Sequence, residues 1–403
     1  MAKKIIFCAD GTWNGPGVDI DHDGNYDNTP TNVWKLFDRL PGDDIANTTR
    51  LADEQEIYFK SAAEGDQVSK YIHGVGDSHN PIIKILGGAA GVGIIQRIVR
   101  GYTFISRHYE PRDEIFIIGF SRGAYTARAL AGLICAMGVL DTYANPIPKE
   151  KAYILGAAAW YQYVESRKKP DSSLWGRIQD TLDMFPKFLT NTAISGHLVK
   201  VDAITAVCVW DTVGALGIPQ YSMDRERIDA FKFVDLTLNG KVQNGLHAVS
   251  IDDRRADFTP TLWDASAQVK QVLFAGGHAD VGGGYPDDNN ESDLSDISLN
   301  WMQHQLEALS VKFKTPSVEF QSIARKSQGP AHDETVENRI WEILPAGRNF
   351  SNRPDLFLHK SVTNRLGMSV RSHPTKSPEI YDPVNLGGWV SGGKVKPGTK
   401  IDT

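Results

Sequence analysis

Ser121 is the residue whose surroundings most clearly favour chemistry. It lies in the run EIFIIGFSRGAYTAR, in which an unbroken apolar stretch leads into Gly119, Ser121 and Gly123 and a helix-forming stretch follows. Such an apolar run is typical of a strand covered on both faces, and glycines leave room where a chain reverses sharply. The arrangement predicts a nucleophile elbow, with the Ser121 hydroxyl exposed at the strand end above the N-terminus of a helix.

A nucleophilic serine needs two partners. A histidine must remove the hydroxyl proton, and an acid must fix the histidine tautomer and stabilise the imidazolium. Two further apolar runs, AVCVWDTVG and VLFAGGHADVGGGY, end in Asp211 and His278. The order Ser121, Asp211, His278 is the order of nucleophile, acid and base along an α/β-hydrolase chain. We therefore predict these three residues as the catalytic triad.

Other residues compete for the last two roles. Asp280 follows the same strand as His278 and is the reserve acid, and His359, in LHKSVTNRL late in the chain, is the competing base. The alternative for Asp211 is a turn residue at a strand end, and for His278 a histidine held by backbone in a glycine-rich turn. The sequence leaves these alternatives open.

The oxyanion that forms on attack requires backbone donors. The N–H of Arg122, directly after the nucleophile, is the first candidate. The turn ADGTWNG after the first predicted strand offers a second donor from Gly11, Thr12 or Trp13. We expect Asp10 to brace this turn through side-chain hydrogen bonds and to take no part in the chemistry.

A second cluster of functional residue types is acidic. In DIDHDGNYD the carboxylates have the spacing that begins an EF-hand loop: Asp19, Asp21, Asp23 and Asp27. Pro30 stands where the bidentate glutamate of the loop is expected, so the full motif is absent. The segment is either a solvated acidic turn or a calcium site that rigidifies a loop beside the active site. The serine chemistry itself requires no cofactor.

The elements that position these residues alternate between strands and helices. The sequence predicts strands at Lys4–Ala9, Glu56–Phe59, Ile115–Gly119, Ala203–Trp210 and Val272–Gly276, and helices at Asn32–Leu40 and Ser295–Leu309. Such alternation is typical of an α/β fold. We predict one α/β-hydrolase-like domain over residues 1–403, with a doubly wound, mostly parallel sheet whose strand ends carry the chemistry.

Residues 143–196 contain no convincing strand. They hold apolar and aromatic side chains at helical spacing, among them Trp160, Tyr161, Tyr163, Trp175, Met184 and Phe185. These helices either enlarge the core or form a cap that roofs a pocket above Ser121. We favour the cap, which predicts higher activity at lipid interfaces, where an amphipathic roof opens onto acyl chains.

Composition narrows the class of protein. With 403 residues, 41% of them hydrophobic and 23% charged, the chain is an ordinary globular protein, and its formal net charge of −6 argues against a nucleic-acid partner. Three cysteines, Cys8, Cys135 and Cys208, are expected to be buried free thiols of a reducing compartment. The chain has no signal-peptide core and no apolar stretch of about 18 residues. We expect a cytoplasmic protein whose export, if any, is independent of a signal peptide.

Seven short motifs occur in a fixed order over residues 3–370: ADGTWN, TNVWKL, YIHGVGD, GFSRGAYTARALAGLI, VWDTVG, HADVGGGY and HKSVTNR. Through them the chain resembles the α/β-hydrolase domains of the type VI secretion phospholipase effectors, lipase family 1. The resemblance implies a serine hydrolase of esters or phospholipids, with nucleophile, acid and base at the positions of Ser121, Asp211 and His278. The chain is more compact than the secreted phospholipases, which carry additional membrane-anchoring modules.

Three functions compete at this stage. The first is an esterase or lipase, with phospholipase A activity as one form, that acts on a lipid or small ester through an acyl-enzyme on Ser121 and makes peripheral contact with membranes. The second is a catalytically silent α/β-hydrolase module that binds a lipid or protein partner. The third, nucleotide binding by GGAAGVG, is weak because no Lys-Ser/Thr pair follows the glycines.

Overall fold

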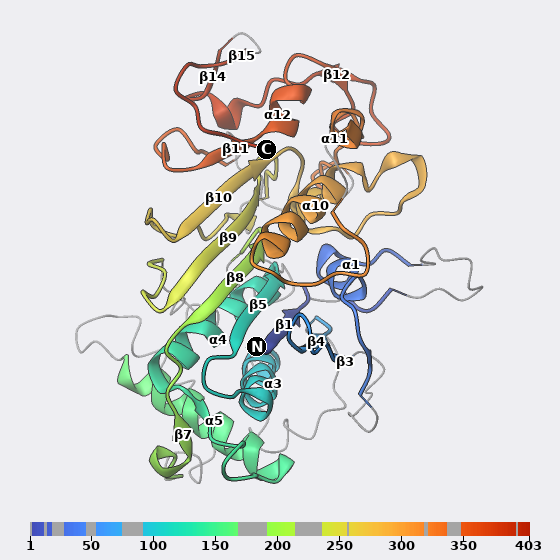
Figure 1. Cartoon of the computed structure of the whole chain (residues 1–403). Coiled ribbons are helices and arrows are strands. Elements are labelled where there is room, and N and C mark those ends of the chain that lie inside the picture. Colours follow the sequence, from blue (N-terminus) through green and yellow to red (C-terminus); the bar gives the residue numbers. More distant parts are fainter. Residues whose placement is uncertain are drawn as a thin grey trace.

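The structure is a computed structural model of the whole chain (Figure 1). It describes residues 2–11, 14–17, 28–45, 54–74, 92–167, 192–213, 236–255, 258–317, 321–336, 348–391 and 394–403.

A ten-stranded sheet forms the centre of the molecule. Its strands lie in the order β16-β11-β10-β9-β8-β5-β1-β4-β3-β2. Their bounds are β1 Lys4–Ala9, β2 Asp43–Asp44, β3 Glu54–Phe59, β4 Gln67–Ile72, β5 Glu114–Phe120, β8 Ile204–Trp210, β9 Val242–Ser250, β10 Val269–Phe274, β11 Phe357–His359 and β16 Ile401–Asp402. All neighbours from β16 to β4 are parallel, and only β3 and β2 pair antiparallel.

Helices and three short antiparallel strand pairs complete the described fold. The helices are α1 Asn32–Asp38, α3 Val92–His108, α4 Arg122–Met137, α5 Lys149–Ser166, α9 His278–Gly282, α10 Asp293–Ala308, α11 Gln321–Lys326 and α12 Lys360–Arg365, with 3-10 turns η1 Ser195–His197, η5 Asp288–Asn290 and η6 Val384–Leu386. The strand pairs are β6 Val139–Leu140 with β7 Leu198–Val199, β12 Ser369–Val370 with β13 Glu379–Ile380, and β14 Val390–Ser391 with β15 Lys394–Val395.

Both faces of the sheet are covered, which explains the unbroken apolar runs. Successive side chains of a strand point to opposite faces. Thus Ile5 and Phe7 of β1 pack in one cluster with residues of α3 and α4, whereas Ile6 and Cys8 pack on the other face with residues of α1 and α10. The predicted doubly wound α/β fold is confirmed, and the three cysteines are buried and free as expected.

The chain order reverses next to β1. After β4 has paired on one side of β1, the chain crosses to β5 on its other side, and β8, β9, β10 and β11 follow outward from there. In open α/β sheets the crevice outside the carboxyl ends of the strands at such a reversal is the usual place for a ligand. The site is therefore expected where β1 and β5 end, which is where Ser121 lies.

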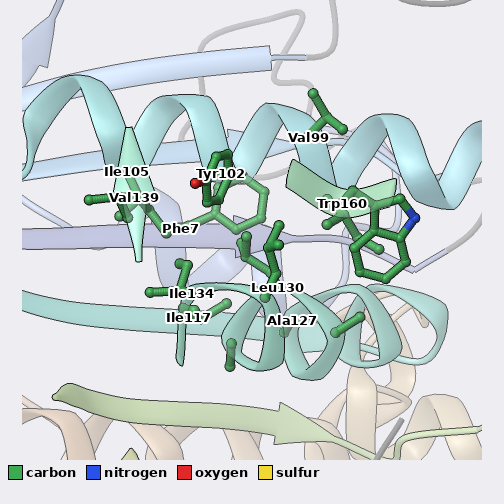
Figure 2. Close-up of a cluster of buried hydrophobic side chains, with 14 of the residues drawn as sticks. Phe7, Val99, Tyr102, Ile105, Ile117, Ala127, Leu130, Ile134, Val139 and Trp160 are labelled. Atoms are coloured by element: carbon green, nitrogen blue, oxygen red, sulfur yellow. The ribbon is translucent and has the colours of Figure 1, made fainter. Parts of the chain in front are cut away.

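Helix α5 does not form the expected roof. Its Trp160 and Tyr163 are buried in the same cluster as Phe7 and residues of α3 and α4. Figure 2 shows Trp160 together with Tyr102 and Leu130 in this cluster. In the described part of residues 143–196 the helix thus enlarges the core, because its apolar side chains meet α3 and α4. Trp175, Met184 and Phe185 lie outside the described residues.

The helices of the described segments were compared with the length and hydropathy that a membrane-spanning helix needs. None of them has the length and apolar character needed to cross a membrane.

Candidate active site

Ser121 occupies a sharp turn between β5, which ends at Phe120, and α4, which begins at Arg122. Its backbone has φ 57° and ψ −121°, which an L-residue adopts only under strain, and its side chain does not cap the helix. A Cβ on Gly123 would collide with the carbonyl oxygen of Ala9, and one on Gly119 with the carbonyl oxygen of Gly123. Both glycines are therefore required for β5, α4 and β1 to approach this closely.

Asp211 and His278 meet beside this turn. Asp211 follows β8, the neighbour of β5, and His278 begins α9 after β10. The imidazole Nδ1 donates to Asp211 Oδ2 over 2.6 Å, and both side chains are buried. His278 Nε2 makes no hydrogen bond with any described residue. The pair therefore has the orientation in which an acid holds a histidine with Nε2 available as a base.

The His278 ring lies next to the elbow. It packs against Phe120, the residue before Ser121, with ring centroids 4.5 Å apart, and edge-on against Phe258 at 4.9 Å. The hydrogen bond expected between Ser121 Oγ and His278 is, however, not formed between these two described side chains. Catalytic hydrogen bonds are often long without substrate and tighten only in the complex.

Arg348 is a component that the sequence does not reveal. Its guanidinium donates to both oxygens of Asp211, over 2.6 and 2.8 Å, and also to the backbone carbonyl oxygens of Ser250 and Phe258. Burial alone would raise the pKa of Asp211, but the charge of Arg348 and the hydrogen bond from His278 outweigh it and hold that pKa well below its usual range. Asp211 is thus an anion at neutral pH.

Burial has the larger effect on His278. It lowers the pKa of the imidazole below the ordinary value of 6.5, although the hydrogen bond and charge of Asp211 oppose the shift. The backbone N–H of His278 donates to Asp253 Oδ2 over 3.1 Å, and Asp253 is paired with Arg255 at 2.6 Å. The imidazole is therefore neutral at neutral pH and fixed in position, as a general base must be.

The two reserve residues lie in other surroundings. Asp280 accepts hydrogen bonds from His332 Nδ1 over 2.7 Å and from the backbone N–H groups of Gly277 and His332. His359 caps α12 and bonds Ser361 Oγ over 2.8 Å, and its strand, β11, is separated from β5 by three strands. In the described structure neither Asp280 nor His359 makes a hydrogen bond with Ser121, Asp211 or the His278 side chain.

Asp10 braces the turn after β1, as expected. Its carboxylate accepts hydrogen bonds of 2.6 Å from Thr31, Tyr71 and the N–H of Gly11, and burial raises its pKa to about 6 against the effect of these bonds. The bond to Asp10 engages the Gly11 N–H, so we leave Gly11 out of the proposed oxyanion hole. Thr12 and Trp13 lie outside the described residues.

The proposed calcium ligands cannot be placed. Asp19, Asp21, Asp23 and Asp27 all lie outside the described residues. Among the residues that are described, no group of three or more histidine, cysteine, aspartate or glutamate side chains is arranged to hold a metal ion.

A family comparison decides the class of domain. Residues 3–305 match the model described as "T6SS, Phospholipase effector Tle1-like, catalytic domain". The chain belongs to this family. The Tle1-like model ends before α11, so the described segments from α11 to β16 lie beyond the matched region.

Individual relatives are distant. An uncharacterised protein of Saccharomyces cerevisiae is 27% identical over 262 residues, which are 64% of this chain and 32% of that protein. Among solved structures, an uncharacterised protein from Pseudomonas aeruginosa has a TM-score of 0.42 at 17% identity, covering 81% of this chain and 48% of the other. The Tle1 effector bound to the VgrG spike has a TM-score of 0.36 at 17% identity, covering 71% and 51%. The chain thus spans about a third to a half of the proteins it matches.

Proposed function

We propose that this Tle1-like domain is a serine hydrolase that cleaves carboxylic esters of lipids, phospholipids among them, through an acyl-enzyme on Ser121. The observation that carries the proposal is the buried Asp211–His278 pair, which packs on Phe120 directly beside the strained Ser121 turn. Ser121, Asp211 and His278 follow three strands of the sheet, β5, β8 and β10, and each has the residue type that its proposed role requires. Membership of a phospholipase effector family supports the substrate class.

The proposed reaction proceeds in two halves. Ser121 Oγ attacks the ester carbonyl carbon while His278 Nε2 takes the hydroxyl proton, and Asp211 stabilises the imidazolium that forms. Arg122 begins α4, and the first N–H groups of a helix point out of its N-terminal end, so its N–H is the proposed donor to the oxyanion. The imidazolium then protonates the departing alcohol, and water activated by the same histidine hydrolyses the acyl-enzyme.

A fluorophosphonate probe tests the nucleophile. An activated serine reacts with it rapidly, so the wild type should be labelled at Ser121 and the Ser121→Ala protein should not. Ser195→Ala is the matched control, since Ser195 is exposed in η1, and its labelling should equal that of the wild type. Unlabelled wild-type protein that still binds phospholipid vesicles would instead support the catalytically silent module.

A substrate panel tests the substrate class. We expect hydrolysis of p-nitrophenyl esters and of phospholipids, with Ser121→Ala as the blank. The buried position of α5 removes part of the argument for interfacial activation, so rates on monomeric and aggregated substrate must be compared directly. Equal rates, with no phospholipid turnover, would reduce the proposal to a small-ester hydrolase without peripheral membrane contact.

Two further expectations remain proposals. Calcium binding by the acidic run predicts calorimetric heat with millimolar calcium and a melting temperature that falls with a chelator, and the absence of both would leave a solvated turn. Export independent of a signal peptide predicts that the protein appears in the medium of secretion-competent cells and stays inside cells that lack the secretion system.

A further inference from the structure

The segment that follows β9 contacts His278 at two points. Strands β9 and β10 are parallel neighbours (Figure 1), so the chain after β9 and the turn from β10 into α9 leave the sheet at the same edge. Asp253 accepts the backbone N–H of His278 over 3.1 Å, and Phe258 lies edge-on to the imidazole with ring centroids 4.9 Å apart. Arg255, which lies between Asp253 and Phe258 in the sequence, contacts both of them.

The guanidinium of Arg255 joins these two contacts into one unit. The backbone N–H and Nε of Arg255 donate to Asp253 Oδ1 over 3.0 and 3.1 Å, and Nη2 donates to Oδ2 over 2.6 Å. The same group lies on the ring of Phe258, with Cζ 3.5 Å from the ring centroid. Among the cationic side chains only arginine suits both contacts, because its planar group bonds a carboxylate through two nitrogens and also stacks on an aromatic face.

The Asp253–Arg255 pair is buried. The two residues are 4% and 7% exposed, so their attraction is little screened by water. Replacement of a buried ion pair by apolar side chains of similar volume is often neutral or stabilising, so the stability of the fold does not by itself account for such a pair. Its contact with His278 indicates a role in the geometry of the site.

The other contacts of His278 leave its backbone unattached. Asp211 bonds Nδ1, which fixes the tautomer, and Phe120 packs against the ring with centroids 4.5 Å apart. The first N–H groups of a helix have no partner within the helix, and His278 begins α9. The carboxylate of Asp253 supplies the missing partner. The position of the imidazole therefore depends on Asp253 as well as on the two contacts of the ring.

The charges of the pair have a smaller effect on the imidazole than its geometry. Burial lowers the pKa of His278 and Asp211 opposes this shift, while Arg255 adds to the lowering and Asp253 counteracts it. Because Arg255 and Asp253 are joined at 2.6 Å, their opposite charges act on the ring from nearly the same place and offset each other in part. What the pair contributes is thus mainly a fixed position.

We propose that Arg255 is a positioning residue for His278. It holds the Asp253 carboxylate on the backbone N–H of the histidine and the Phe258 ring against the imidazole, and so keeps the imidazole in place beside the Ser121 turn. The catalytic value of this role rests on the proposed hydrolase function. A misplacement of about 1 Å can cost about 10²-fold in rate, so the role should be visible in turnover.

Ester hydrolysis by the full-length protein tests the proposal through kcat and KM. Arg255→Met should lower kcat about 10- to 100-fold and leave KM unchanged, because the position of a base affects the transition state and not the bound substrate. Arg255→Lys should regain only part of the loss, since an ammonium group cannot bond both oxygens and lie flat on the ring. Arg254→Met is the matched control. Arg254 is exposed and pairs with Asp333 at 3.7 Å, so its replacement should leave both constants unchanged.

Proton NMR adds a readout that requires no turnover. A buried imidazole Nδ1–H that is bonded to a carboxylate is protected from exchange with water and resonates downfield, and comparison with His278→Ala identifies the signal of His278. This signal should broaden or disappear in Arg255→Met and persist in Arg254→Met. The Nδ1–H of His332, which bonds Asp280 over 2.7 Å, is the internal reference.

The two readouts separate this proposal from the proposed function. Equal kcat in Arg255→Met and Arg254→Met, or a rise in KM alone, would overturn the positioning role without affecting the hydrolase proposal. A wild type that hydrolyses no ester would overturn the hydrolase proposal. The NMR signal of His278 would then decide, since its loss in Arg255→Met supports the positioning role and its persistence overturns it.

Phe258→Leu keeps the test decisive if Arg255→Met fails to fold. It leaves the Asp253–Arg255 pair intact and removes only the aromatic ring that lies between the guanidinium and the imidazole. We expect kcat to fall several-fold at unchanged KM, in a protein with wild-type circular dichroism. An unchanged kcat together with an unchanged NMR signal of His278 would contradict the proposal.

Discussion

Two buried Asp–His pairs each contribute one residue to α9, His278 in the first pair and Asp280 in the second, and in both pairs the imidazole Nδ1 bonds the carboxylate. His278 Nδ1 bonds Asp211 over 2.6 Å, and His332 Nδ1 bonds Asp280 over 2.7 Å. Both aspartates are fully buried, and each histidine is 6% exposed. The pairs differ in what surrounds them. Arg348 donates hydrogen bonds to both oxygens of Asp211, whereas a second carboxylate, Glu291, lies 3.4 Å from His332 Nε2.

The surroundings, more than the hydrogen bond itself, determine what each imidazole can do. Burial lowers the pKa of His278. The charge and hydrogen bond of Asp211, which is itself paired with Arg348, oppose this shift only in part. Burial also acts on His332, but two carboxylates outweigh it and raise its pKa. The ring of His332 stacks on Tyr285 as well. His278 is thus a neutral imidazole able to accept a proton, and His332 is half of a structural ion pair.

The comparison predicts its largest effect at the two histidines. His278→Ala should lower kcat for ester hydrolysis by about 10⁴ to 10⁶, the usual cost of losing a triad member. His332→Gln should keep kcat within about tenfold, because it contacts neither the elbow nor the base. Steady-state kinetics on proteins with wild-type circular dichroism measure both. A comparable loss in the two variants would end the distinction between the pairs.

Substitution of Asp211 and of Asp280 should differ in its effect on kcat almost as much as substitution of the two histidines. Asp211→Asn should lower kcat by about 10⁴ through loss of the imidazole tautomer, and it leaves Arg348 buried without a counter-charge at a cost of about 3–5 kcal/mol of stability. The double variant Asp211→Asn, Arg348→Met should regain stability in urea unfolding but not activity. Asp280→Asn is the matched single variant. If its activity fell as far as that of Asp211→Asn, Asp280 would have to be reconsidered as the acid.

A smaller effect is expected at Arg348 itself. In the wild type the acid limb of the pH profile of kcat/KM should lie below pH 6.5, because burial lowers the pKa of His278. Arg348→Met removes a cation that offsets Asp211, so the pKa of His278 should rise and the limb should move to higher pH. Arg348→Lys keeps the charge and serves as the control. An unchanged limb in Arg348→Met would mean that Arg348 only positions Asp211.

The smallest effect concerns stability at His332. Its folded pKa is raised, so the ion pair stabilises the protein fully below the unfolded pKa of about 6.5, and this contribution is lost as the pH rises through the folded value. The free energy of unfolding of His332→Gln should therefore fall about 1–2 kcal/mol below that of the wild type at pH 5. The gap should close at alkaline pH. A gap that is independent of pH would assign the loss to packing against Tyr285.

The turn at Ser121 between β5 and α4, and the positions of Asp211 and His278 after β8 and β10, could be predicted because their sequence signals are local. The strand Lys4–Ala9 coincides with β1, since its residues are buried on both faces and nothing polar interrupts the run. Strands β4 and β9 were not predicted, because polar residues break their pattern. The buried polar side chains in these strands have partners from other elements. Lys70 pairs with Glu54 and Glu56, and His247 bonds the N–H of Thr212 and the side chain of Gln271.

Arg348 and α5 mark the limit of sequence reasoning. Arg348 lies in a segment without hydrophobic periodicity, and its partner Asp211 is 137 residues away in the sequence. No local sequence pattern therefore indicates this contact. The aromatic side chains of α5 do predict a helix with an apolar surface. The pattern cannot say whether that surface meets the core or roofs a pocket, since both bury the same residues, and in the structure Trp160 lies in the core.

The reversal of strand order beside β1 leaves one edge of this strand unpaired for part of the synthesis of the nascent chain. β1 leaves the ribosome about a hundred residues before β5, the strand that covers one of its edges. At the usual pace of translation this interval lasts about 5 to 20 s. During it the apolar strand Ile5–Ala9 has at most its β4 edge paired, so chaperone capture during synthesis should centre on this segment and end when the nucleophile strand emerges.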